Sequence, residues 1–280
     1  MLKRTTLLTL AAASIFAACG DAPDTISLSL RQREKSGDTT IQIEYWTPAE
    51  TAIIICDMWD KHWCLGATQR VAEIAPAMNR MLDTARRRGV TIVHAPSDCM
   101  TFYKDYPQRT KVAQCKDDAI AAAADGSSLP SEEGAAWPIE QSDGGCDSDG
   151  IVNDQVWRRQ IETLTIAEPD VISDSGEEIG VYFQQHGIKN VILVGVHTNM
   201  CIVGRSFGLR AMTRMDMNVA LMRDMTDLMY NPQQPPYVSH FEGLDLMIGY
   251  IEQYICPTVL STDFTGEPPF LFSERALEDE

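Results

Sequence analysis

The sequence has few basic residues for its length. It carries 23 Lys and Arg against 40 Asp and Glu among 280 residues, so its formal net charge at pH 7 is -17. Proteins that bind nucleic acids or anionic membrane surfaces through charge need basic patches. The composition therefore argues against nucleic acid as a partner. Solubility is the favoured explanation of the excess of acidic residues, and an acidic docking surface is the alternative.

The amino-terminal apolar run is too short for a transmembrane helix. A basic start is followed by an apolar stretch from Leu7 to Ala18, with small residues before Cys19. This pattern is typical of a secretory signal, so we expect residues 1–19 to direct export to the periplasm. The end of the run resembles the lipobox of bacterial lipoproteins, which predicts a lipid anchor to the membrane at Cys19. Ordinary signal-peptide cleavage is the alternative.

Export changes how the cysteines are interpreted. Of 8 cysteines, seven remain when Cys19 is set aside, and an odd number in an oxidising compartment indicates disulfides plus one free thiol. Six paired cysteines allow 15 pairings, so the connectivity does not follow from the sequence. We expect Cys115 to pair with Cys146, because both lie in loop-like sequence.

Short apolar runs alternate along the chain with segments of helical periodicity. Thr51 to Cys56 (TAIIIC) is typical of a strand that is buried on both faces. Apolar residues then recur at helical spacing up to Arg88, where Gly89 ends the helix, and Val90 to Ala95 predicts a second strand. A strand, a helix and a strand in this order favour a parallel sheet with a right-handed crossover.

The second half of the chain has the same alternation. It predicts strands at 170–173, 190–196 and 218–222, and helices at 177–186, 201–212 and 241–254. We therefore predict an α/β fold, a three-layer α/β/α sandwich with a mostly parallel, Rossmann-like sheet. The expected domain spans residues 41–262, with a polar tether at 20–40 and an acidic tail at 263–280. Residues 102–160 predict no strand and form an irregular insertion, typical of a functional lid or of a segment that contacts a partner.

Three polar or reactive residues follow predicted strands. Asp57 directly follows TAIIIC, Asp98 follows the second strand, and Cys201 follows NVILVGV after a short turn. Since sites in parallel sheets lie beyond the carboxyl ends of the strands, we expect these residues to meet at one edge. Asp57 is then a candidate base, or alternatively a carboxylate that caps its loop or pairs with Lys61.

Cys201 is a candidate nucleophile. A thiol in the first turn of a helix is exposed to backbone N–H groups and to the positive end of the helix dipole, which stabilise the thiolate. The same N–H groups can hold an oxyanion. A buried or disulfide-bonded cysteine with no chemical role is the alternative.

The joint pattern resembles a known family. Asp57 after TAIIIC, together with the segment VILVGVHTNMCIVGRSFGLRAM, is similar to the isochorismatase-like cysteine hydrolases, which include nicotinamidases and carbamoyl-amide hydrolases. The similarity covers roughly residues 51–224 in element order, and GVHTNMC is its most specific part. The strings DMWDKHWC, HAPSD, RSFGLR and TDLMYN resemble a little-characterised branch of that superfamily.

The resemblance implies a mechanism. Cys201 would attack the carbon of a small amide and form a thioester, while Asp57 would pass the thiol proton to the leaving group. A cis peptide between Val196 and His197 would direct the N–H groups of His197 and Cys201 at the oxyanion. No cofactor is expected, and family analogy suggests a homo-oligomer. The remaining expected site residues, which would bind substrate, are Trp59 and Asp98.

The sequence departs from the family at the lysine of the usual triad. Ser173 and Asp174 stand where that lysine is expected. Another cation would have to stabilise the thiolate, and Arg159 is the residue we favour, with Lys61, Lys104 and Arg158 as further candidates. The metal-binding pattern of the nicotinamidases is also absent, because His94 and Asp98 occur in the wrong order and spacing. We therefore expect no metal, and His94 is interpreted as a strand-end histidine with a local hydrogen bond.

Together these features predict an exported hydrolase that cleaves a C–N bond of a small amide through Cys201. Two different functions remain open at this point. One is a binding or structural protein that kept the fold and lost catalysis. The second is a vinyl-ether hydrolase that uses Asp57 without a cysteine nucleophile.

Overall fold

The structure is a computed structural model, and it describes residues 25–148 and 155–278. Cys19 and the expected signal peptide lie outside these residues. Within them, we find no helix with the length and apolar character that membrane crossing requires.

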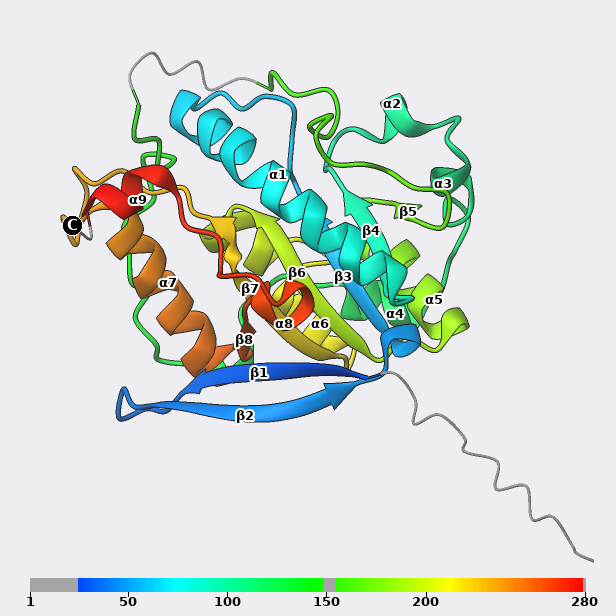
Figure 1. Ribbon diagram of the computed structural model, residues 1–280, viewed down its shortest axis with the longest axis horizontal. Coiled ribbons are helices and arrows are strands. Elements are labelled where there is room, and N and C mark those ends of the chain that lie inside the picture. The colour runs from blue at the N-terminus through cyan, green and yellow to red at the C-terminus, as the bar shows by residue number, and fades with distance from the viewer. Residues whose placement is uncertain (1–24, 149–154, 279–280) are drawn as a thin grey trace, which may run out of the picture.

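An eight-stranded sheet forms the centre of the molecule (Figure 1), with the strand order β2-β1-β8-β7-β6-β3-β4-β5. The six strands from β8 to β5 pair in parallel, and β1 runs antiparallel to both β8 and β2. The predicted mostly parallel sheet is therefore confirmed. The strands are β1 (Ile26–Arg33), β2 (Thr39–Trp46), β3 (Thr51–Cys56), β4 (Thr91–Ala95), β5 (Val171–Ile172), β6 (Asn190–Val196), β7 (Asn218–Asp227) and β8 (Thr258–Val259).

Helices cover both faces of the sheet, which gives the three predicted layers. In Figure 1, α1 crosses in front of β3 and β4, while α6 lies behind the sheet. The longer helices are α1 (Leu65–Arg87), α5 (Gly176–His186) and α7 (His240–Tyr254). The shorter ones are α2 (Met100–Tyr103), α3 (Pro107–Thr110), α4 (Asp118–Ala123), α6 (Leu209–Arg214), α8 (Thr262–Thr265) and α9 (Ser273–Glu278), with 3-10 turns at Pro48–Glu50 and Pro130–Glu132.

The two central strands explain why the sheet is buried on both faces. Every residue of β3 (TAIIIC) and of β6 (NVILVGV) is buried, and the two strands pair along their length from Thr51 and Asn190 to Cys56 and Gly195. A continuous apolar run loses contact with water on both sides only between two layers of helices. The ends of β3 and β6 therefore lie next to each other at the same edge of the sheet.

The expected tether at residues 20–40 is wrong for the residues that the structure describes. A β-hairpin of β1 and β2 begins at Ile26, and β1 extends the sheet beyond β8. The reason is the alternation in ISLSLRQR, which buries Ile26, Leu28 and Leu30 on one face. The strand was not predicted because residues 20–40 contain many charged residues of both signs, and their polar composition was given more weight than the alternation.

The expected acidic tail at residues 263–280 is anchored to the domain at two described positions. Phe264 and Phe272 are buried, and the side chain of Glu73 in α1 accepts hydrogen bonds from Ser273. Burial of these two aromatic side chains stabilises the contact with the domain, because each removes a large apolar surface from water. The acidic residues near the end of the chain do not prevent this contact.

The predicted helix at 201–212 is divided into two parts. Residues Thr198–Ile202 form one π-helical turn, which we call the Cys201 turn, and α6 begins only at Leu209. Val203 and Gly204 continue the Cys201 turn as helix, and Gly208 lies in the irregular segment that precedes α6, consistent with the low helix propensity of glycine. Cys201 therefore lies within a short turn after β6 and not at the start of a long α-helix.

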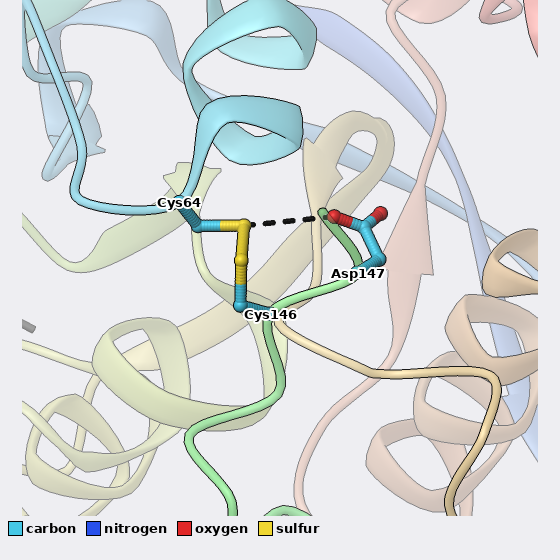
Figure 2. A group of neighbouring side chains, drawn as sticks. All are labelled: Cys64, Cys146 and Asp147. Atoms are coloured by element: carbon cyan, nitrogen blue, oxygen red, sulfur yellow. Dashed lines mark hydrogen bonds between the residues drawn. A yellow bond between two sulfur atoms is a disulfide. The ribbon is translucent and has the colours of Figure 1, made fainter. Parts of the chain in front are cut away.

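The irregular insertion at 102–160 contains short helices and, among its described residues, only an isolated bridge from Gln160 to Trp59. A disulfide ties it to the domain, but the expected pairing of Cys115 with Cys146 is wrong. Cys146 is bonded to Cys64, just before α1, with 5.6 Å between their Cα atoms (Figure 2). Cys115 is free. Cys64 and Cys146 are 82 residues apart, so no local pattern points from one to its partner.

Candidate active site

Asp57 lies at the carboxyl end of β3 and is fully buried. Its φ of 47° turns the chain sharply after the strand. The Oδ1 atom accepts a hydrogen bond from the backbone N–H of Ser97 at 2.7 Å, and Oδ2 lies 3.2 Å from Nε of Arg205. Burial raises the pKa of the Asp57 carboxyl, and the Arg205 charge and a hydrogen bond from Cys201 oppose that rise only in part.

Cys201 is partly buried and donates a hydrogen bond from its thiol to Asp57. Burial raises the pKa of the thiol above its ordinary value, and the negative charge of Asp57 raises it further. Arg205 and a backbone hydrogen bond from His197 act in the opposite direction. The thiol of Cys201 therefore lies next to a carboxyl group that is positioned to accept its proton.

The peptide bond between Val196 and His197 is cis, as the family resemblance implied. The carbonyl oxygen of His197 accepts hydrogen bonds from the N–H groups of Met200 and Ile202, which closes the Cys201 turn on itself. The backbone N–H groups of His197 and Cys201 therefore belong to one compact unit directly after β6.

Arg205, and not the expected Arg159, is the cation beside Asp57. Arg159 instead pairs with Asp60, at 3.9 Å, and with Glu162, at 2.5 Å. Arg205 reaches Asp57 because it follows Cys201 by four residues, and its backbone N–H donates to the Cys201 carbonyl at 3.0 Å. This spacing is the signal that could have identified Arg205, since residues four apart lie on one side of a helical turn.

The other candidate cations, Lys61, Lys104 and Arg158, do not pair with Asp57 either. The ammonium of Lys104 is 4.0 Å from Asp105, and its side chain is 69% exposed. Lys61 and Arg158 line a separate cavity of 640 Å³ beside Trp157.

The acidic residues around the missing lysine are partly neutralised by other cations. Glu178 forms a bidentate ion pair with Arg109, and Glu177 pairs with Lys116 at 2.7 Å. Asp174 accepts a hydrogen bond from the backbone N–H of Asp98, and burial raises the pKa of its carboxyl. Two of these three carboxylates are therefore held by partners outside the Asp57 and Cys201 pair.

The two expected substrate-binding residues flank the pair. Trp59 is buried, donates its Nε1–H to the Ser97 carbonyl at 3.1 Å and stacks on Trp157 with 4.3 Å between ring centroids. Asp98 has an exposed side chain whose Oδ2 lies 4.0 Å from an Nη atom of Arg205. Asp57, Asp98 and Cys201, which follow three different strands, thus meet at one edge of the sheet, as expected.

A cavity of 570 Å³ lies beside the Cys201 turn and is lined by Cys201 and Arg205, with Trp137 and Gln141 from the insertion. Gln141 accepts a hydrogen bond from the side chain of Asn199, which also binds both the N–H and the carbonyl of Met229. The irregular insertion therefore supplies part of the wall of this cavity, and Asn199 fixes that wall to the Cys201 turn.

A buried charge network next to the site was not foreseen from the sequence. Arg70 binds the carboxylates of Asp227 and Asp147, each at 2.7 Å, and His240 lies 2.8 Å from Asp227. Burial alone would raise the pKa of Asp227, but His240 and Arg70 more than offset this and hold it below its ordinary value. The members of this network are far apart in the sequence, and no short motif links them.

Two groups could be considered for a metal. Figure 2 shows Asp147 beside Cys64 and Cys146, but the two sulfurs are bonded to each other and Asp147 is held by Arg70. His94 lies between Gln160, at 2.8 Å, and Asp170, at 3.0 Å, so it is a strand-end histidine with hydrogen bonds on both ring nitrogens. Neither group offers a set of free ligand atoms.

Several solved structures of other proteins are similar to this fold. No protein-family model and no curated protein matches the chain. A cysteine hydrolase from Pseudomonas syringae is similar, with 17% identity over 77% of this chain and 91% of that one, at a TM-score of 0.49.

Two further solved structures are similar at a comparable level. The pyrazinamidase of Pyrococcus horikoshii, solved in complex with zinc, has 18% identity over 75% of this chain and 99% of its own, at a TM-score of 0.43. The N-carbamoylsarcosine amidase of Thermoplasma acidophilum has 12% identity over 76% and 96%, at a TM-score of 0.42. Isochorismatase-family proteins from other bacteria are also similar.

Proposed function

We propose that the protein is a cysteine hydrolase that cleaves a C–N bond in a small amide. The observation that carries the proposal is the contact of Asp57 with both Cys201 and Arg205 at one edge of the sheet. A nucleophile, a base and a cation in contact with one another are the groups that acyl transfer through a thioester needs.

In the first half of the reaction, Cys201 Sγ attacks the amide carbon and its proton moves to Asp57. The negative oxygen that forms is held by the N–H groups of His197 and Cys201. The C–N bond then breaks, and Asp57 gives the proton to the leaving nitrogen, which departs as ammonia or an amine. The product of this half is a thioester on Cys201.

In the second half, Asp57 accepts a proton from a water molecule that attacks the thioester carbon. The C–S bond breaks, the acid product leaves, and the proton on Asp57 returns to sulfur. Asp57 thus acts as base and acid twice, which suits a carboxyl whose pKa is raised by burial. The positive charge of Arg205 stabilises the negative charge, whether it lies on the carboxylate of Asp57 or on the sulfur of Cys201.

The cellular location is part of the proposal. The basic and apolar amino-terminal pattern with Cys19 supports an exported protein that is held at a membrane by a lipid. The Cys64–Cys146 disulfide is consistent with an oxidising compartment.

The test uses a panel of small primary and N-substituted amides with release of ammonia or amine as the readout. We expect activity in the wild type, loss of turnover in Cys201→Ala, and a mass increase on Cys201 that matches the acyl group when turnover is stopped by acid. Activity that persists in Cys201→Ala but not in Asp57→Asn would favour chemistry by Asp57 alone. A folded protein without activity, whose Cys201 fails to react with iodoacetamide, would refute the proposal and favour a non-catalytic protein.

A further inference from the structure

A second cavity, of 260 Å³, lies away from the cysteine and is rich in arginine. In Figure 1 the red segment that leads from α8 to α9 runs past α7 beside this region. Its charged lining consists of Arg31, Arg223, Arg275, Asp224 and Asp245. The chain has only 23 basic residues in total, so three arginines around one small cavity are a local reversal of its acidic character.

The arginines differ in how they are paired. Arg31 binds Glu252 at 2.6 Å, and Arg275 binds Asp245 at 2.8 Å. Arg223 donates one hydrogen bond, to the Thr258 hydroxyl at 3.1 Å, and no carboxylate oxygen of the described residues lies within 4.0 Å of it. Charges that are largely removed from water are normally paired, so Arg223 has N–H donors to offer to an anion.

The acidic groups of the cavity do not satisfy Arg223. Both oxygens of Asp224 are engaged, by the N–H and hydroxyl of Ser261 and by the N–H of Phe270. Outside the lining, Asp263 accepts a hydrogen bond from the N–H of Ser29. Burial lowers the pKa of Arg223, the positive charge of Arg31 lowers it further, and nearby carboxylates oppose this only in part. An added anion would relieve this imbalance.

Apart from Thr226 of β7, the rest of the lining is apolar, and most of it comes from α7 and from the segment before α9. It includes Leu244, Ile248, Phe270 and Phe272. A ligand that combined an anionic head with a short apolar tail would match both halves of the wall, because guanidinium groups bind carboxylates in a bidentate manner and the apolar side chains remove a tail from water.

We propose that this cavity is a binding site for a small organic anion, with Arg223 as the group that binds a carboxylate. The site is separate from the 570 Å³ cavity at Cys201, since no residue lines both. The proposal does not depend on the hydrolase activity.

Isothermal titration of the full protein with hexanoate, with inorganic phosphate and with hexylamine tests this site. We expect one hexanoate per chain with a Kd of about 1 mM or lower, weaker binding of phosphate because it lacks the tail, and no binding of hexylamine. In Arg223→Gln the affinity for hexanoate should fall about tenfold or more, since a charged hydrogen-bonding partner is lost.

Arg87→Gln is the matched control. Arg87 is exposed, bonds only to the Thr84 hydroxyl among the described residues and has no carboxylate partner there, so this variant removes the same charge without touching the cavity. Equal hexanoate affinity in Arg223→Gln and Arg87→Gln would overturn the proposal, as would the absence of saturable hexanoate binding to the wild type. Circular dichroism of each variant checks that it is folded, and Arg223→Lys, which keeps the charge, should retain part of the affinity.

Discussion

The substitution Arg205→Gln tests whether this arginine replaces the lysine of the usual triad. Its Nε lies 3.2 Å from the carboxylate of Asp57. At that distance two opposite unit charges attract by about 5 kcal/mol at an effective dielectric constant of about 20, and by about 1 kcal/mol in water. The Arg205 side chain is 35% exposed, so solvent screens the pair, and we expect a coupling energy of about 2 kcal/mol.

A double-mutant cycle of Arg205→Gln and Asp57→Asn measures this coupling by urea denaturation at pH 7. Arg205→Gln leaves a fully buried carboxylate without its cation, so we expect it to destabilise the wild type more than it destabilises Asp57→Asn, by about 2 kcal/mol. The pH dependence follows from the sign of the shift. Because the pKa of Asp57 is raised in the folded protein, the penalty should shrink as the pH falls through that pKa and the carboxyl becomes neutral.

The same variant should slow the alkylation of Cys201 by iodoacetamide. Arg205 lowers the pKa of the thiol, so its loss reduces the thiolate fraction at any pH below that pKa. Arg159→Gln is the control, because Arg159 pairs with Asp60 and Glu162 and not with Asp57. A coupling energy near zero, together with equal alkylation rates in the two variants and the wild type, would refute the assignment of Arg205.

Three further outcomes are expected. Loss of the disulfide in Cys64→Ser should destabilise the protein by up to about 4 kcal/mol, since the bond closes a loop over 82 residues; urea denaturation with and without reductant measures this. Asn199→Ala leaves the buried N–H and carbonyl of Met229 without partners and should cost about 2–4 kcal/mol in the same assay. Asp227 contributes stability above its ordinary pKa of 3.8 that is lost as the pH falls towards its lowered folded value, so acid titration of Asp227→Asn should show a smaller loss than the wild type.

The parallel part of the sheet is predictable because its signals are local. TAIIIC and NVILVGV are continuous apolar runs, and such runs are buried on both faces wherever they occur in a layered α/β fold. The alternating ISLSLRQR of β1 is equally local, but it lies within a polar segment, residues 20–40, whose charged residues have both signs. Leu28 and Leu30 are buried while Ser27 and Ser29 are more exposed, as the period of two predicts for a strand with one buried face.

The partners of the site are less predictable because they depend on distances in space. Nothing in the sequence around Cys146 specifies Cys64, and nothing around Arg70 specifies Asp227. The first contact joins the insertion to the residue before α1, and the second joins α1 to β7. A pairing that closes a loop of many tens of residues leaves no periodicity in the sequence that could be read beforehand.

Arg205 is the instructive exception, because it is near Cys201 in the sequence and still escapes prediction. The family pattern places its cation on the strand before the helix that leads to the nucleophile, where this chain has Ser173 and Asp174. The chemistry, however, requires only a positive charge within reach of the carboxylate and the thiol. A residue four positions after Cys201 meets that requirement from within the same turn. The position of a charge in space is therefore a better guide to its role than its position in the family's order of residues.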